Sequence, residues 1–361
     1  MIGWLQQRVD AFRGRGAHAP TVPPMDGALR PNTLLQDARV VARITAPDNL
    51  LQHGGRVLFS SGNAVHSVDP VSGLVEAVRS FDAPVTAMAS QSGVLAVALQ
   101  GGRLILSQAG SAERVIDGIA GKGQGITALS SGAGNSLLVC LGSWVNGPEA
   151  WKHDLMQSGR SGSLWSVALP DGKVTQLAGG LGWPAGVIAT GTGVVVAESW
   201  RHRLVALEGK TERPLVTDLP GYPSRIIASP RGGFWLAVFA PRNQLTELVL
   251  REKPYRERMM REVDPAFWVA PSLSPAGSFY EPMQGGAIRT HGIVKPWAPT
   301  RSYGLLVRLD AAFQPIASYH SRADGSFHGV TSAVELKDQV LVASCGGNAI
   351  LSLGLDAGGL A

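Results

Sequence analysis

A unit of about 40 residues recurs along this chain of 361 residues, and the repeat constrains the fold more than any other feature. Each unit begins with a short apolar segment, passes through a turn marked by glycine, and enters a second strand rich in β-branched residues. A unit of this length matches one four-stranded sheet of a β-propeller, so the sequence predicts an all-β, six-bladed β-propeller. The units start at residues 49–51, 85–87, 126–128, 186–188, 225–227 and 329–331.

A ring of six sheets closes only if a strand from one end of the chain completes a sheet formed by the other end. Residues 38–44 (ARVVARI) precede the first unit, and we expect them to pair with the strand near residues 349–351. Residues 1–37 contain the proline-rich segment APTVPPMDGALRPN and are predicted to form an N-terminal arm. The propeller is then expected to span residues 38–361.

Two insertions interrupt the repeat, at about residues 142–162 in the third unit and 242–301 in the fifth. In the second insertion, Leu245, Leu248 and Val249 have helical spacing, and Pro254 is expected to open a further short helix. Long ordered insertions on a rigid scaffold commonly form lids and specificity loops. We therefore expect both insertions to cover one mouth of the central channel.

The composition narrows the classes of partner. The chain has 45 Gly and 23 Pro but only 16% charged residues, as expected for many short strands joined by tight turns. The net charge of +5 is scattered, whereas nucleic-acid binders concentrate basic charge on one face, so no nucleic-acid partner is expected. No apolar run reaches the ~20 residues needed to cross a bilayer, and the N-terminus lacks the apolar core of a signal peptide. We expect a cytoplasmic protein with no membrane partner, in which Cys140 and Cys345 are free thiols.

The stretch from residue 160 to residue 263 carries the segments GRSGSLWSV, AESWRHRL, LPGYPSR and APRN in sequence. The residues of these segments and their order resemble those of the strictosidine-synthase-like family of six-bladed β-propellers. This family is related to the gluconolactonases and paraoxonases. The resemblance implies a small-molecule pocket at one mouth of the channel. For the metal-binding relatives it also implies a calcium or other divalent ion, held there by Glu, Asn and Asp.

In a propeller, the residues just before each first strand surround one mouth of the channel; here they include Asp48, Gln124, Ala185, Ser224 and His328. A divalent ion needs several oxygen ligands, usually including carboxylates. Asp48 is the one carboxylate in this set, and Ala185 has no ligand atom where the relatives read Pro-Asn-Gly. We therefore expect no cofactor and no metal, with a divalent cation such as calcium near Asp48 as the alternative.

Two histidines are candidate general bases for the attack of water on an ester or lactone: His291 on the second insertion and His328 before the sixth unit. The resemblance also implies a catalytic glutamate at the start of the sixth blade, as in strictosidine synthase. The matching position here is Thr331, which cannot act as an acid or base near neutral pH. Arg225 can bind a carboxylate or an oxyanion, or else form a salt bridge with Asp218.

The leading prediction is a hydrolase of a small ester or lactone metabolite. The alternatives are a non-catalytic propeller that binds or senses a small molecule, and a condensing enzyme closer to strictosidine synthase. The partner is a small molecule in each case, and the oligomeric state is left open. Glu198 is expected to be structural, paired with Arg201 or Arg203. Besides the two histidines, the predicted pocket is formed by Asp48, Gln124, Trp144, His153, Trp183, Tyr222, Ser224, Arg225, Trp297 and Thr331.

Overall fold

The computed structural model describes residues 22–119, 125–209, 211–275 and 300–355, together with the backbone of two short strands, β20 (Arg289–Thr290) and β21 (Ile293–Val294). Six antiparallel sheets of four strands form its framework. In the first three sheets the strands are β2 (Pro47–His53), β3 (Arg56–Ser61), β4 (Ala64–Val68) and β5 (Val75–Ser80); β6 (Val85–Gln91), β7 (Val94–Leu99), β8 (Arg103–Gln108) and β9 (Arg114–Asp117); and β10 (Ile126–Ser131), β11 (Ser136–Leu141), β12 (Gly162–Ala168) and β13 (Val174–Leu181). In the last three they are β14 (Pro184–Ala189), β15 (Val194–Glu198), β16 (Arg203–Glu208) and β17 (Thr211–Val216); β18 (Gly221–Ala228), β19 (Phe234–Pro241), β22 (Gly304–Leu309) and β23 (Pro315–Ser321); and β24 (Val330–Glu335), β25 (Gln339–Ser344), β26 (Ala349–Gly354) and β1 (Arg39–Arg43).

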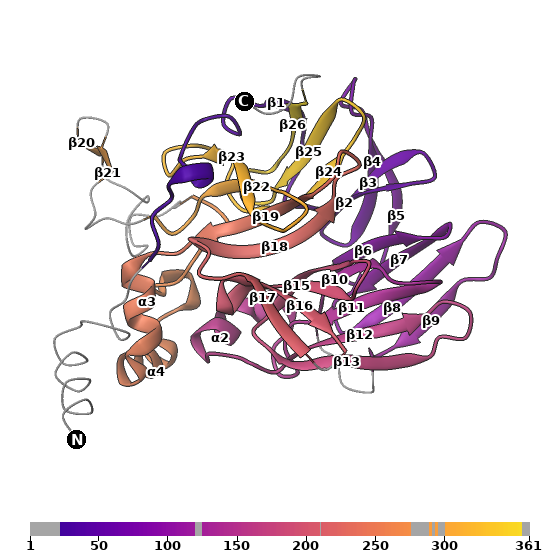
Figure 1. Ribbon diagram of the computed structural model, residues 1–361, viewed down its shortest axis with the longest axis horizontal. Helices are drawn as coiled ribbons and strands as arrows, with labels where there is room; N and C mark the ends of the chain where they lie inside the picture. Colours follow the sequence, from indigo (N-terminus) through magenta and orange to yellow (C-terminus); the bar gives the residue numbers. More distant parts are fainter. Residues whose placement is uncertain are drawn as a thin grey trace.

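The first strands of the six sheets contact one another in chain order, from β2 through β6, β10, β14 and β18 to β24, and β24 returns to β2. The sheets therefore follow one another as six blades in a closed ring, and Figure 1 shows their strands. The predicted all-β, six-bladed propeller is confirmed.

Apolar clusters between neighbouring blades hold the ring together. Leu104 and Leu106 of β8, for example, belong to one buried cluster with Leu137 and Val139 of β11 in the next blade. Alternation along each strand gives a blade two apolar faces, and burying these faces against the neighbouring blades stabilises the ring. Tight hairpins keep the strands in register: the turn between β6 and β7 is Ser92–Gly93, and both residues have positive φ, 51° and 77°, as a type I′ turn requires.

The N-terminal strand closes the ring. Strand β1 pairs antiparallel with β26, with Arg39 opposite Ser352 and Arg43 opposite Ala349, as expected for residues 38–44. The described residues before β1 include the short 3-10 helix η2 (Gly27–Leu29) and lie against β23, where Asn32 Nδ2 donates to the carbonyl oxygen of Ser318 at 2.8 Å. This segment thus contacts the fifth blade, whereas β1 completes the sixth.

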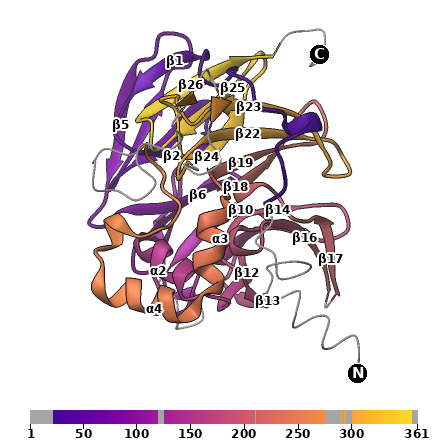
Figure 2. The ribbon, with the colours of Figure 1, turned by 90° about the vertical axis from the view of Figure 1, so that its left-hand side faces the viewer.

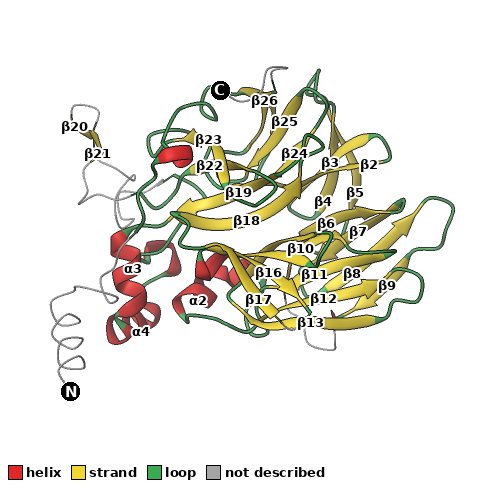
Figure 3. Cartoon of the chain, viewed as in Figure 1, coloured by secondary structure: helices red, strands yellow, loops and turns green. Residues whose placement is uncertain are grey.

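Both insertions contribute helices on one side of the ring. The first holds the 3-10 helix η4 (Pro148–Ala150) and helix α2 (Trp151–Met156). The second holds α3 (Gln244–Arg251), α4 (Lys253–Glu262) and the 3-10 helix η6 (Pro265–Phe267). Figures 1 and 2 show α2, α3 and α4 side by side, and Figure 3 shows them on the same flank of the strands.

Local sequence explains where these helices begin. Asn243 Oδ1 accepts the N–H of Thr246 at 2.8 Å and caps α3, and a proline stands in the first turn of α4, as the sequence predicts for Pro254. On α3, Val249 is buried, whereas Leu245 and Leu248 are exposed. None of the helices in the described residues is long and apolar enough to cross a membrane.

Candidate functional site at the mouth of the channel

Each of the six first strands carries a β-bulge close to its start. A bulge leaves its extra residue outside the hydrogen-bonded ladder and re-aims that residue. Because the first strands surround the channel, the bulges place their extra residues in a ring, called here the bulge ring. It consists of Asn49 and Leu50 on β2, Thr86 on β6, Thr127 on β10, Ala185 on β14, Ser224 and Arg225 on β18, and Thr331 on β24.

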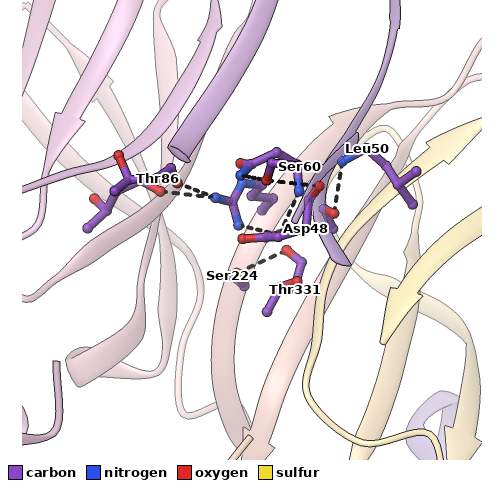
Figure 4. A network of polar contacts seen from close by, with 10 residues as sticks. Asp48, Leu50, Ser60, Thr86, Ser224 and Thr331 are labelled. Atoms are coloured by element: carbon purple, nitrogen blue, oxygen red, sulfur yellow. Dashed lines mark hydrogen bonds and ion pairs between the residues drawn. The ribbon is translucent and has the colours of Figure 1, made fainter. Parts of the chain in front are cut away.

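A cavity of about 140 Å³ opens at this ring. Figure 4 shows Asp48, Thr86, Ser224 and Thr331 close together there, although they come from four different blades. Both insertions reach the cavity, as expected, because residues of η4, of α2 and of the segment after η6 line it. The lining residues are Asp48, Thr86, Thr127, Pro148, Trp151, Trp183, Ala185, Ser224, Arg225, Phe239, Leu273 and Thr331.

The guanidinium of Arg225 donates three hydrogen bonds at the bulge ring. Its Nη1 donates to Oδ1 of Asp48 at 3.0 Å, and its Nη2 donates to the carbonyl oxygens of Thr86 at 3.0 Å and Thr127 at 3.4 Å. The side chains of Arg225 and Asp48 are 16% and 25% exposed, so the ion pair is largely removed from water. A charge in such surroundings needs hydrogen-bonded partners, and these contacts provide them.

A close approach of two first strands brings Arg225 into place. A Cβ atom on Gly186 of β14 would lie 2.2 Å from the carbonyl oxygen of Ser224 and 3.0 Å from Cα of Arg225. Only glycine allows β14 to pass β18 at this distance. Ser224 is held from the other side, because its Oγ donates to the carbonyl oxygen of Thr331 at 3.1 Å.

Aromatic side chains form the walls of the cavity. Trp183 stacks on Trp200 with ring centroids 5.2 Å apart, and Trp151 of α2 meets Phe239 of β19 edge-on at 5.5 Å. The first insertion is tied to this cluster, since Trp200 Nε1 donates to Oδ1 of Asp154 at 2.8 Å. An apolar wall around a few polar groups is the usual composition of a small-molecule site.

Glu198 supports this wall without touching the cavity. Its buried carboxylate accepts the N–H of Gly182 at 2.7 Å and pairs with both Arg201, at 3.0 Å, and Arg203. Trp183, the residue after Gly182, has a φ of 53°, a backbone conformation that residues other than glycine rarely adopt. The structural role expected for Glu198 is confirmed, and it consists in holding the turn that presents Trp183.

Five residues of the predicted pocket do line the cavity: Asp48, Trp183, Ser224, Arg225 and Thr331. Of the two alternatives for Arg225, the salt bridge with Asp218 is wrong, because Asp218 pairs with Arg242 at 2.5 Å and Arg225 pairs with Asp48. Gln124, His291 and Trp297 lie outside the described residues.

Three other predicted residues do not line the cavity. Tyr222 is fully buried in the apolar cluster that holds Phe239, and burial raises the pKa of its hydroxyl. His153 packs edge-on against Trp268, with ring centroids 4.6 Å apart. Trp144 is 40% exposed and its Nε1 donates to Ser163 Oγ at 3.2 Å.

His328 is also absent from the cavity lining and is fully buried. Its Nδ1 lies 2.8 Å from Ser302 Oγ, and its Nε2 lies 2.9 Å from the carbonyl oxygen of Arg322. Burial lowers the pKa of this imidazole, and both ring nitrogens already have partners. This geometry gives His328 a structural role in place of the general-base role expected for it. The bulge on β24 places Thr331, three residues after His328, in the bulge ring.

Sequence reasoning missed Thr86, Thr127, Pro148, Trp151, Phe239 and Leu273 as lining residues. A signal for the two threonines was present. The segments VTA at 85–87, ITA at 126–128 and VTS at 330–332 place threonine between an apolar and a small residue at the same point of three units. The middle residue of each is the one that the bulge releases from the ladder.

The donor set of the ring does not fit a divalent ion. Three oxygen groups that converge there, the Asp48 carboxylate and the carbonyl oxygens of Thr86 and Thr127, already accept hydrogen bonds from Arg225. A hard cation prefers several carboxylate and carbonyl oxygens, and a guanidinium at the point of convergence repels it. Within the described residues, no group of three or more His, Cys, Asp and Glu side chains is arranged to hold a metal.

No protein-family model matches the chain, and no curated protein matches it in sequence. Solved structures do match the fold. One is a calcium-binding protein, regucalcin, from Agrobacterium tumefaciens, with 14% identity and a TM-score of 0.55 over 88% of this chain and 93% of that one. Another is a gluconolactonase from Xanthomonas campestris, with 11% identity and a TM-score of 0.56 over 90% of this chain and 91% of that one. At these identities the comparisons show a shared six-bladed β-propeller fold.

Proposed function

We propose that the cavity binds a small, largely apolar molecule and that the protein is a metal-independent hydrolase of an ester or lactone bond in it. The observation that carries the proposal is the carboxylate of Asp48, which lines the same cavity as the aromatic side chains of Trp151, Trp183 and Phe239. The gluconolactonase from Xanthomonas campestris has the same fold, which supports the class of reaction.

Asp48 is held in a fixed orientation. Its Oδ1 accepts hydrogen bonds from Arg225 Nη1 at 3.0 Å and from the backbone N–H of Asn49 at 2.7 Å. No described residue donates to Oδ2, which leaves that oxygen for a water molecule or a substrate. A carboxylate with one oxygen anchored and the other available can act as a general base.

The proposed reaction uses Asp48 and Thr331. Asp48 takes a proton from a water molecule as the water oxygen attacks the carbonyl carbon of the ester or lactone. The Thr331 hydroxyl, which is buried and has no partner among the described residues, donates a hydrogen bond to the oxygen that gains negative charge. When the intermediate collapses, the carbon–oxygen bond to the leaving alcohol breaks, and Asp48 returns the proton to that alkoxide.

The test compares Asp48→Asn with a matched surface variant, Asp82→Asn, whose side chain is 70% exposed. Turnover is measured against a panel of aryl esters and of five- and six-membered lactones. Asp48→Asn is expected to lower kcat/KM by at least about 100-fold, because general-base catalysis contributes that much. Asp82→Asn should behave as the wild type. Full turnover by Asp48→Asn would remove Asp48 from the mechanism.

A non-catalytic binding propeller is the second candidate. The observation that favours it is that none of the described lining residues is a histidine or a cysteine, the side chains most often used as bases and nucleophiles. One experiment distinguishes hydrolysis from binding alone. A ligand that raises the Tm of the wild type but is never hydrolysed, with every ester and lactone of the panel left intact, favours binding alone.

A further inference from the structure

We infer that the guanidinium of Arg225 is the built-in central cation of this propeller, occupying the position at which oxygen atoms of several blades converge and closing the channel beneath the cavity. The inference is independent of the proposed hydrolysis, because it concerns what holds the ring together and not the reaction.

The three oxygen atoms that Arg225 binds come from three different blades. Asp48, Thr86 and Thr127 belong to β2, β6 and β10, and Arg225 itself belongs to β18. One side chain therefore connects four of the six blades. The residues it joins are 177, 139 and 98 positions away in the sequence.

Two of the three oxygen atoms belong to β-bulges. A bulge removes backbone groups from the ladder, and buried backbone oxygens need another donor. The carbonyl oxygens of Thr86 and Thr127 lie at the bulges of β6 and β10, and they receive N–H groups from Arg225. A guanidinium suits this task because its planar fork carries five donors, whereas an ammonium offers three from a single point.

Arg225 lies between two cavities along the channel. A second cavity, of about 190 Å³, is lined by residues farther along the first strands, among them Met88, Ser130 and Ile226. Among the residues that the structure describes, Arg225 alone lines both this cavity and the cavity at the mouth. Its side chain thus separates the two, so that the channel is closed by a protein cation.

The experiment measures Tm and metal binding. The variants are Arg225→Ala, Arg225→Lys, Arg225→Met and the double variant Asp48→Asn with Arg225→Ala. Arg231→Ala is the control, because Arg231 has a side chain 42% exposed and pairs with Glu335 at the rim of a blade. Each is melted alone, with about 10 mM guanidinium chloride, well below denaturing concentrations, and with about 10 mM calcium chloride, above the millimolar Kd of weak sites.

We expect Arg225→Ala to lower Tm by roughly 5–10 °C, and guanidinium or calcium to restore at least about half of that loss. Neither cation should restore the double variant, which lacks the carboxylate, or change Arg231→Ala. The wild type should bind no calcium in equilibrium dialysis, and its Tm should not respond to calcium or to EDTA.

Three results would overturn the inference: stoichiometric calcium in the wild type, an unchanged Tm in Arg225→Ala, or a lowered Tm that no cation restores. If Arg225→Ala does not yield folded protein, the comparison of Arg225→Lys with Arg225→Met decides. Arg225→Lys keeps the positive charge, so its Tm should be at least about 3 °C above that of Arg225→Met. Equal Tm values for these two variants would contradict a role for the charge.

Discussion

Nε of Arg242 lies 3.0 Å from Oε1 of Glu247, and this buried pair fastens α3 to the propeller. Glu247 stands in the first turn of α3, and Arg242 directly follows β19. Nε2 of His202, in the blade formed by β14 to β17, lies 3.5 Å from the same carboxylate oxygen. Arg242 also donates to the carbonyl oxygen of Leu219 at 3.2 Å. The helices beside the cavity are thus held to one blade by an ion pair and to a second blade by a hydrogen bond from His202, as well as by apolar contact.

Glu247→Gln is expected to loosen this attachment. Burial alone raises the pKa of Glu247, but hydrogen bonds from His202 and Arg242 outweigh it and lower the pKa from 4.5 to about 2. The carboxylate therefore contributes stability that is fully present above pH 4.5 and is lost as the pH falls through about 2. Glu247→Gln should lower Tm at pH 7 and flatten the dependence of stability on pH between 4.5 and 2.

Amide hydrogen exchange should also become faster in α3 and α4 of this variant, because local opening of the insertion costs less free energy. Glu257→Gln is the control, since Glu257 forms only an exposed pair with Lys253 on α4. Equal melting of Glu247→Gln and Glu257→Gln would show that the buried pair does not stabilise the insertion.

The repeat, the closing strand and the two helices of the second insertion were predictable because they depend on local patterns. Glycine turns, β-branched runs and the proline before α4 act within a few residues of the chain. The pairing of Glu198 with Arg201 and Arg203 was predictable for the same reason. The exposure of Leu245 and Leu248 was not, because the inward face of α3 is set by the contact of Glu247 with Arg242 and His202.

The centre of the site depends on long-range geometry. Arg225 meets Asp48 across 177 residues, whereas the sequence suggested the nearby Asp218. Thr331, and not His328, lies in the bulge ring for a similar reason. The position of a bulge decides which residue of a first strand faces the channel. A periodic pattern locates a strand to within a few residues, and an error of three residues changes the predicted chemistry.

A second pH-dependent group is His320, which is fully buried in β23. Its Nδ1 lies 3.1 Å from the Tyr303 hydroxyl and its Nε2 lies 2.7 Å from Ser318 Oγ. Burial, aided by the charge of Arg322, lowers its pKa from 6.5 to about 4. The folded protein therefore needs the neutral imidazole, and stability should be full above pH 6.5 and fall as the pH drops from 6.5 toward 4.

The slope in that window should approach 1.4 kcal/mol per pH unit, the value for uptake of about one proton on unfolding. His320→Gln should reduce the slope in urea denaturation between pH 6.5 and 4, with the half-buried His53→Gln as the control. An unchanged slope in His320→Gln would mean that another group causes the acid sensitivity.

His328→Ala should destabilise the fold and leave ligand binding intact. Removing the imidazole leaves the Ser302 hydroxyl and the Arg322 carbonyl without their partner, a loss of about 1–3 kcal/mol for a buried polar group. Tm should therefore fall, while the Kd of any ligand of the mouth cavity stays within about threefold of the wild type, because His328 does not line that cavity. A normal Tm together with a 100-fold loss of turnover would restore the general-base role for His328.

Deletion of residues 1–44 should prevent the ring from closing. The deletion removes β1, which pairs with β26 from Arg39 opposite Ser352 to Arg43 opposite Ala349. Strand β26 would then expose a row of unpaired backbone groups, which promotes aggregation. Deletion of residues 1–21 keeps β1 and the contact of Asn32 with Ser318, so this shorter deletion is the control. We expect the long deletion to yield aggregated protein by size-exclusion chromatography and the short one to melt as the full chain does. A soluble long deletion with an unchanged Tm would show that β26 needs no partner, and that the ring is held by contacts between blades alone.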